Sequence, residues 1–220
     1  MTAPVAPPAD GTTDAQEQAA PRRGRPRSQA SEEAILVATL DLLASGCGPS
    51  TVSINAIAKR ARTGKDTIYR RWPCKEDLFL DALASQQQTI DIPTDGPVRD
   101  GLIAALASLI ERFQDERNRR ILRGLYGAGD EFPKLRRRYQ QEVLEERREN
   151  VRALVRAGIA RGELVRHGDP TQAALMPFAA VVMSALEDTP IPGNPRRAAA
   201  KMVDAILHGL AAPPNITADQ

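Results

Sequence analysis

The stretch Thr51–Phe79, TVSINAIAKRARTGKDTIYRRWPCKEDLF, decides the fold of this 220-residue chain. Its first part places Ile54 and Ile57 at helical spacing, with Thr51 or Ser53 as the candidate N-cap. The pattern predicts a first helix of about two turns with one buried apolar side.

A turn and a second short helix follow directly. Residues 62–64, Arg-Thr-Gly, predict the turn, and residues 65–72 predict another helix of about two turns. Pro73 ends that helix, because the residue before a proline avoids the helical region. A further helix is expected over residues 75–88, so the stretch predicts short helices packed around one tight turn.

The second short helix carries groups that suit duplex DNA. The major groove is wide enough for an α-helix, and phosphate contacts set register while base contacts set sequence preference. We expect its exposed side to present Lys65, Asp66, Thr67, Tyr69 and Arg70. We assign Thr51, Tyr69 and Lys75 to phosphate, and Gly64, Lys65, Asp66 and Arg70 to groove contact. Asp66 suits either a cytosine amino group or a helix cap.

Positive charge gathers around the same stretch. Residues 21–75 hold eleven Lys or Arg residues against four acidic residues, although the formal net charge of the chain is only +2. Within this segment Arg23, Arg25 and Arg27 form a flexible basic arm. The arm predicts either insertion into an A·T-rich minor groove or a tail that adds sequence-independent affinity through counterion release.

The framework of the stretch resembles the N-terminal DNA-binding domain of the tetracycline repressor (TetR) family. The matching residues are Thr51, Val52, Ile57, Ala58, Ala61, Lys65, Thr67, Tyr69, Arg70, Lys75, Glu76, Leu78 and Phe79. Three residues depart from the family pattern: Arg62 replaces the turn glycine, Gly64 the serine cap and Asp66 a small groove-facing residue. The resemblance implies an all-α fold, with an N-terminal three-helix helix-turn-helix domain followed by a helical ligand-binding and dimerisation domain.

The rest of the chain also has helical periodicity and no strand-like alternation. We expect a helix from Ser31 to about Gly46, long helices over residues 133–160, 170–187 and 195–210, and about nine helices in all. The expected organisation is a disordered tail with the basic arm at 1–27, the DNA-binding domain at 28–75, the regulatory domain at 76–212 and a flexible tail at 213–220.

The resemblance implies two functions for the helical body, dimerisation and effector binding. It implies a dimer interface on the last two helices, for which we select Ala180, Met183, Ala199, Met202, Val203, Ile206 and Leu210. It also implies an effector pocket between the middle helices, for which we select Phe113, Tyr126, Phe132, Tyr139, Met176 and Phe178. All of these residues also suit a protomer core. Because only 4% of residues are aromatic, we expect an apolar or amphipathic small molecule rather than a caged cation.

Residues 134–152 alternate arginine and glutamate, with Arg138 and Glu142 four residues apart. Opposite charges at that spacing form weak ion pairs on one helix face. We therefore expect a solvated face here.

Several other classes of protein find little support. His167 and His208 have no acidic or nucleophilic partner at suggestive spacing, and Cys47 and Cys74 lack metal-binding spacing, so we expect no enzyme activity, metal or cofactor. Cys74 beside Lys75 leaves a redox-active thiolate open, against a simple substitute for a serine cap. With no secretory signal and no apolar run of about 18 residues, we expect a cytoplasmic protein without membrane contact.

These observations favour a homodimeric transcriptional regulator. It would most simply be a repressor, released from a near-palindromic double-stranded DNA operator by a small-molecule effector. The alternative is a nucleoid-associated or division-type DNA-binding protein whose helical body binds a protein partner, which an exposed apolar patch on the body would favour.

Overall fold

The computed structural model describes residues 25–46, 48–86, 96–128, 131–164 and 169–209. The elements are α1 (Arg25–Ala44), α2 (Ile54–Arg60), α3 (Lys65–Tyr69), α4 (Lys75–Ser85), α5 (Val98–Gln114), α6 (Glu116–Gly127), α7 (Pro133–Arg138), the π turn η1 (Tyr139–Leu144), α8 (Glu145–Ala160), α9 (Pro170–Leu186) and α10 (Pro195–His208). Taking α7, η1 and α8 as one continuous rod, these described ranges form nine helices and no strand. The all-α expectation is confirmed.

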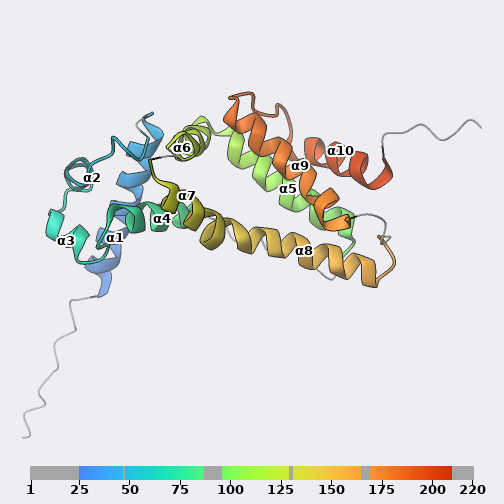
Figure 1. The fold of residues 1–220 in the computed structure, drawn as a ribbon, viewed down its shortest axis with the longest axis horizontal. Coiled ribbons are helices and arrows are strands. Elements are labelled where there is room, and N and C mark those ends of the chain that lie inside the picture. Colours follow the sequence, from blue (N-terminus) through green and yellow to red (C-terminus); the bar gives the residue numbers. More distant parts are fainter. Residues whose placement is uncertain (1–24, 47, 87–95, 129–130, 165–168, 210–220) are drawn as a thin grey trace, which may run out of the picture.

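The helices form two groups joined by the rod (Figure 1). At one end α1 to α4 pack together, and we call this group the head. At the other end α5, α9 and α10 lie side by side with the far half of the rod, and we call this group the body. Among the described helices, none is long and apolar enough to cross a membrane.

The first helix begins earlier than its sequence predicts. The expected start was Ser31, but α1 begins at Arg25. Pro26 fits the first turn of a helix, because the N–H that proline lacks would have no intrahelical partner there.

The two short helices of the opening stretch form as expected. Ser53 is the N-cap of α2, and its side chain accepts a hydrogen bond of 3.1 Å from the amide of Ala56. α3 ends at Tyr69 rather than at residue 72, although the chain continues in a turn in which the amide of Trp72 donates to the carbonyl of Ile68. Ile68 and Trp72 are buried in the head, which fixes the opposite face of α3 toward solvent.

The turn between α2 and α3 is a Schellman motif closed by Arg62. The amide of Thr63 donates to the carbonyl of Ala58 at 3.0 Å, and that of Arg62 to the carbonyl of Lys59 at 3.3 Å. Arg62 has a φ of 53°, the left-handed region that glycine adopts without penalty. α8 ends in the same motif, with Gly162 at the place that Arg62 takes after α2. Arginine in place of glycine therefore changes the energy of the turn between α2 and α3 and not its geometry.

The head does not complete its hydrophobic core alone. The first of two buried clusters contains apolar residues of α1 to α4, with Phe79 and Leu78 fully buried. Three further elements of the chain, α6, α7 and η1, supply the remaining members, which are Ile121, Leu125, Leu135, Tyr139 and Val143. α6 and the near half of the rod therefore belong to the core that supports the DNA-facing helices.

The second cluster holds the body together. It joins α5, α8, α9 and α10, with Leu106, Ile110 and Leu154 among its buried residues. At its edge the guanidinium of Arg119, only 8% exposed, donates to the carbonyls of Phe113 and Gln114 and to Asp188. This arginine closes the C-terminal end of α5 and ties it to the end of α9.

The rod was predicted as one helix over residues 133–160, and it is continuous but not uniform. Tyr139–Leu144 forms a π turn between α7 and α8. Residues before and within this turn, such as Leu135 and Val143, pack in the first cluster. Residues after it, such as Val151 and Leu154, pack in the second. The rod therefore connects the two cores physically.

Arg62→Gly is expected to raise the free energy of unfolding by about 1 kcal/mol, because glycine removes the left-handed penalty at this exposed residue. Urea denaturation followed by circular dichroism measures the change. Gly162→Ala is the matched control and should lower stability by about 1 kcal/mol. Equal stability of Arg62→Gly and wild type would show that the turn is not strained.

Candidate nucleic-acid interface

α3 presents a polar face that is free of the core. Lys65, Asp66 and Arg70 are exposed, and Tyr69 is 50% exposed although it is a large aromatic residue. Thr67 is half-buried, and Gly64 is the exposed N-cap with no side-chain capping bond. The structure thus exposes at α3 most of the groups that were selected for groove and phosphate contact, whereas Thr51 and Lys75 lie on other segments.

Two ion pairs hold this region to α1. Arg71, just after α3, pairs with Glu32. Arg60, at the end of α2, donates to Asp41 with contacts of 3.1 and 2.7 Å. Because α1 is anchored in the core, both contacts limit how far α2 and α3 can move independently.

Thr51 lies exposed at the loop before α2. Its hydroxyl is 3.1 Å from the carbonyl of Gly48, to which it donates. The oxygen retains acceptor capacity, but a bond to phosphate would require the hydroxyl proton to turn from Gly48.

Lys75, which was assigned to phosphate, makes contacts within the head. Its ammonium donates to the carbonyl of Val52 at 2.9 Å and lies over the rings of Phe79 and Phe132, 5.4 and 5.3 Å from their centroids. Burial lowers the pKa of Lys75, although the negative charge of Glu131 opposes this. The lysine therefore joins α4 to the start of α2, and its assignment to phosphate stays a prediction.

The neighbouring Cys74 is not arranged as a thiolate. Its thiol donates to Asp77 at 3.0 Å. That hydrogen bond, together with burial, raises the pKa of Cys74. These contacts favour the reading of Cys74 as a substitute for a serine cap over a redox-active thiolate, because the ammonium of Lys75 is directed to Val52 and the thiol donates to Asp77.

Part of the basic arm belongs to α1. Arg25 and Arg27 lie in its first turn, so their backbone is helical, whereas a flexible arm was expected. Arg23 lies outside the described residues. The tail of residues 1–24 and the C-terminal residues from 210, including Leu210, also lie outside the described ranges.

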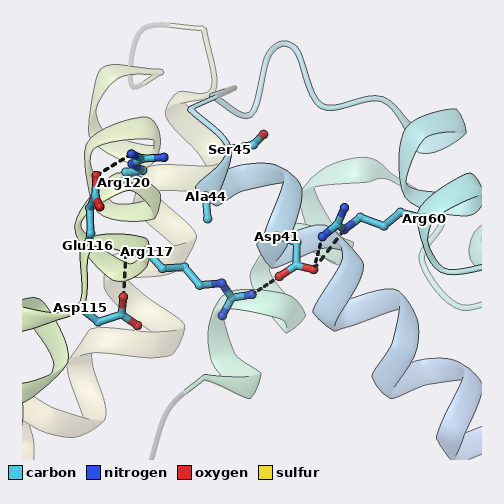
Figure 2. Close-up of a pocket in the computed structure, with 8 residues that line it drawn as sticks. All are labelled: Asp41, Ala44, Ser45, Arg60, Asp115, Glu116, Arg117 and Arg120. Atoms are coloured by element: carbon cyan, nitrogen blue, oxygen red, sulfur yellow. Dashed lines mark hydrogen bonds and ion pairs between the residues drawn. The ribbon is translucent and has the colours of Figure 1, made fainter.

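A charged groove of about 390 Å³ separates the head from α6 (Figure 2). Its lining residues are Asp41, Ala44, Ser45, Arg60, Asp115, Glu116, Arg117 and Arg120. Three arginines face three carboxylates there, so the groove has no net preference for an anion or a cation.

Asp41 bridges this groove. Figure 2 shows its carboxylate between Arg60 of α2 and Arg117 of α6, which donates at 2.6 Å. Burial alone would raise the pKa of Asp41, but the hydrogen bonds of the two arginines outweigh it and the pKa lies below its ordinary value. The bridge is thus intact at neutral pH and is lost only as pH falls through that lowered pKa. Sequence reasoning missed it, since no local spacing connects residues 41 and 117.

The six residues selected for an effector pocket are divided between two places. Phe132 and Tyr139 pack with the first cluster, whereas Phe113, Tyr126 and Phe178 pack with the second. Met176 is 60% exposed on α9. The structure does not bring these six side chains to one site.

The residues selected for a dimer interface are also of two kinds. Ala199 and Val203 are buried in the second cluster, as the alternative of a protomer core requires. Met202 and Ile206 are half-buried, and Ala180 and Met183 are exposed on α9.

Comparisons with known proteins agree with the geometry. Residues 35–82 match the family model described as bacterial regulatory proteins, tetR family, and residues 92–206 match the tetracyclin repressor-like C-terminal domain. The HTH-type transcriptional regulator YdeS of Bacillus subtilis (strain 168) is 34% identical over 65% of this chain and 72% of its own length. The regulator Rv1556 of Mycobacterium tuberculosis (strain H37Rv) is 29% identical over 60% of this chain and 65% of its own length.

Solved structures share the fold. FadR from Bacillus subtilis, in complex with stearoyl-CoA, has a TM-score of 0.67 at 17% identity, covering 81% of this chain and 99% of that one. NalD of Pseudomonas aeruginosa, the secondary repressor of the MexAB-OprM multidrug efflux pump, has a TM-score of 0.62 at 21% identity, covering 83% and 97%. At these identities the likeness concerns the fold.

Lys75→Met is expected to lower the free energy of unfolding by about 1.5 kcal/mol, because it removes a charged hydrogen bond to Val52. It should leave the salt dependence of DNA binding unchanged. Urea denaturation and fluorescence anisotropy measure the two effects. Lys65→Met is the control with the opposite pattern, unchanged stability and a smaller salt slope. A smaller slope for Lys75→Met would instead support its assignment to phosphate.

Proposed function

Because the chain belongs to the tetracycline repressor family of bacterial transcriptional regulators, we propose that it is a repressor whose α3 enters the major groove of an operator and whose body releases it in response to a small molecule. The observation that carries this proposal is the exposed face of α3, fixed by buried Ile68 and Trp72. Its proposed place of action is the cytoplasm.

Within this proposal the contacts divide into two sets. Tyr69 and Thr51 bind phosphate and set the register of the helix. Gly64, Lys65, Asp66 and Arg70 face the groove, with Thr67 beside them. Exposure of Tyr69 and Arg70 supports this division, since neither side chain is used by the core. The arginines near the N-terminus add affinity by charge neutralisation.

The route from body to head runs through α6 and the rod. α6 holds Asp41 through Arg117, and it contributes Ile121 and Leu125 to the core under the reading helix. A shift of α6 therefore changes both a polar and an apolar contact of the head. An effector that binds one arrangement better than the other would change DNA affinity by that difference.

A homodimer is the proposed assembly. Met183, 54% exposed, and Ala180 lie on the outer side of α9, and small or flexible apolar side chains suit packing of one helix on another. Ala199 and Val203 support the interface from behind, within the protomer core.

Arg70→Met is expected to lower the slope of log K against log [salt] by about one, because one phosphate or groove cation is lost. The target is a duplex selected from a random library by the wild-type protein, with anisotropy measured at several salt concentrations. Arg137→Met changes another exposed arginine, on α7, and is the control that should keep the wild-type slope. If the two variants bind alike, α3 is not the reading helix.

Met183→Glu is expected to dissociate the dimer, because it places a charge on each side of an apolar contact. Sedimentation equilibrium of the full chain measures the assembly. Val37→Glu is the matched control, since Val37 on α1 is also 54% exposed. A wild-type chain that is monomeric yet binds DNA would contradict the dimer and favour a body that engages another protein.

A further inference from the structure

Arg62 has a backbone conformation that glycine adopts at most such places in this chain. Among the described residues, the glycines with a positive φ are Gly46, Gly162, Gly193 and Gly209. Within the same ranges, the residues other than glycine with a positive φ are Arg62 and Asp188, at 53° and 58°. A side chain costs free energy in this conformation, so its presence points to a use for that side chain.

The side chain of Asp188 has such a use inside the protein. Its carboxylate pairs with Arg119 at 2.8 Å and with Arg123 at 2.6 Å. These contacts join the end of α9 to α6, and glycine could not make them. The left-handed conformation at Asp188 is therefore matched by a function of its carboxylate.

The side chain of Arg62 has no such use within the protein. It is exposed, and its guanidinium makes no hydrogen bond or ion pair with any residue that the structure describes. Asp66, the nearest carboxylate along the chain, does not pair with it. By contrast, Arg60 and Arg71 of the same head both pair with carboxylates of α1. The guanidinium of Arg62 is thus available to a partner from outside the chain.

The surroundings of Arg62 favour a partner with many negative charges. Lys59, near the end of α2, and Lys65, the first residue of α3, lie three residues before and after it. Both are exposed and form no ion pair within the described ranges. Residues 54–70 contain five lysines or arginines and one carboxylate, that of Asp66. The repulsion among these cations falls when a polyanion binds.

The position of the turn indicates which part of DNA Arg62 meets. Figure 1 shows α2 and α3 at the outer edge of the head, away from the body. In a helix-turn-helix domain the second helix enters the major groove and the first crosses the sugar-phosphate backbone. With α3 in the groove, the turn that Arg62 closes lies at the rim, beside phosphates. The planar guanidinium of arginine matches the oxygens of a phosphate.

We propose that Arg62 binds a backbone phosphate of DNA at the rim of the major groove, an assignment that rests on the proposed function of α3. The contact adds affinity for any duplex and no preference among sequences. Glycine would relieve the left-handed turn but could not reach the phosphate. Stability and DNA affinity therefore change in opposite directions at this residue.

The test uses Arg62→Gln in the full chain, which removes the charge and keeps a side chain in the left-handed turn. Fluorescence anisotropy at several salt concentrations follows binding to the duplex selected by the wild-type protein and to a scrambled duplex of equal composition. The slope of log K against log [salt] should fall by about one for both duplexes, with the ratio of their affinities unchanged.

Arg196→Gln is the matched control, since it makes the same change of charge at an exposed arginine of α10, in the body (Figure 1). It should keep the wild-type slope. An unchanged slope for Arg62→Gln overturns the contact, and so do equal losses in the two variants, which would reflect net charge alone. A loss confined to the selected duplex also overturns it, because that result indicates a base contact.

Arg62→Gly gives a second readout, which a purely structural role would not produce. It should unfold at a higher urea concentration than the wild type and still bind both duplexes more weakly, with the smaller slope. Arg62→Gly that binds DNA as tightly as the wild type overturns the contact.

Arg70→Met separates this proposal from the function of α3. If Arg70→Met lowers the slope and Arg62→Gln does not, α3 keeps its function and the contact of Arg62 is lost. The reverse result keeps the phosphate contact and removes α3 from the groove.

Discussion

The head of this protein depends on a core that it shares. Phe79 and Leu78 of α4 are fully buried, but the cluster around them closes only with Ile121 and Leu125 of α6 and with residues of the rod. Because apolar surface must be covered to hold α2 and α3 in place, the position of the DNA-facing helices depends on α6 and the near half of the rod. Regulation therefore needs no separate hinge, since any displacement of α6 or α4 already alters the packing under α3.

Polar contacts fix how the helices around this shared core are arranged. The carboxylate of Asp41 is held on one side by Arg60 and on the other by Arg117, so α2 and α6 are tied through one acceptor (Figure 2). Elsewhere in the head, Lys75 joins α4 to the carbonyl of Val52. Both contacts are partly screened by solvent, so they select among arrangements of the helices more than they add stability.

Most helix positions and the exposed face of α3 could be predicted, because caps, breakers and periodicity act locally. Ser53 and Gly162 illustrate this. The sequence could not predict where a long cationic side chain points. A lysine or arginine at a given position in a helix can extend into solvent or fold back onto the protein, and its place in the sequence is the same in both cases. Lys75 turns inward, and Arg119 closes the end of α5. The start of α1 was missed because Ser31 is a good cap in sequence, while helical backbone already extends to Arg25.

The π turn in the rod bears on how this chain can vary in length. Each residue added to a regular α-helix rotates everything beyond it by about 100°, which would turn the second half of the rod away from its core. A π turn absorbs one additional residue within a single wider turn, so the flanking halves can keep their faces. Tyr139–Leu144 is consequently the part of the rod where losing one residue would cost least, since an unbroken α-helix could still present Leu135 and Val151 to their respective clusters.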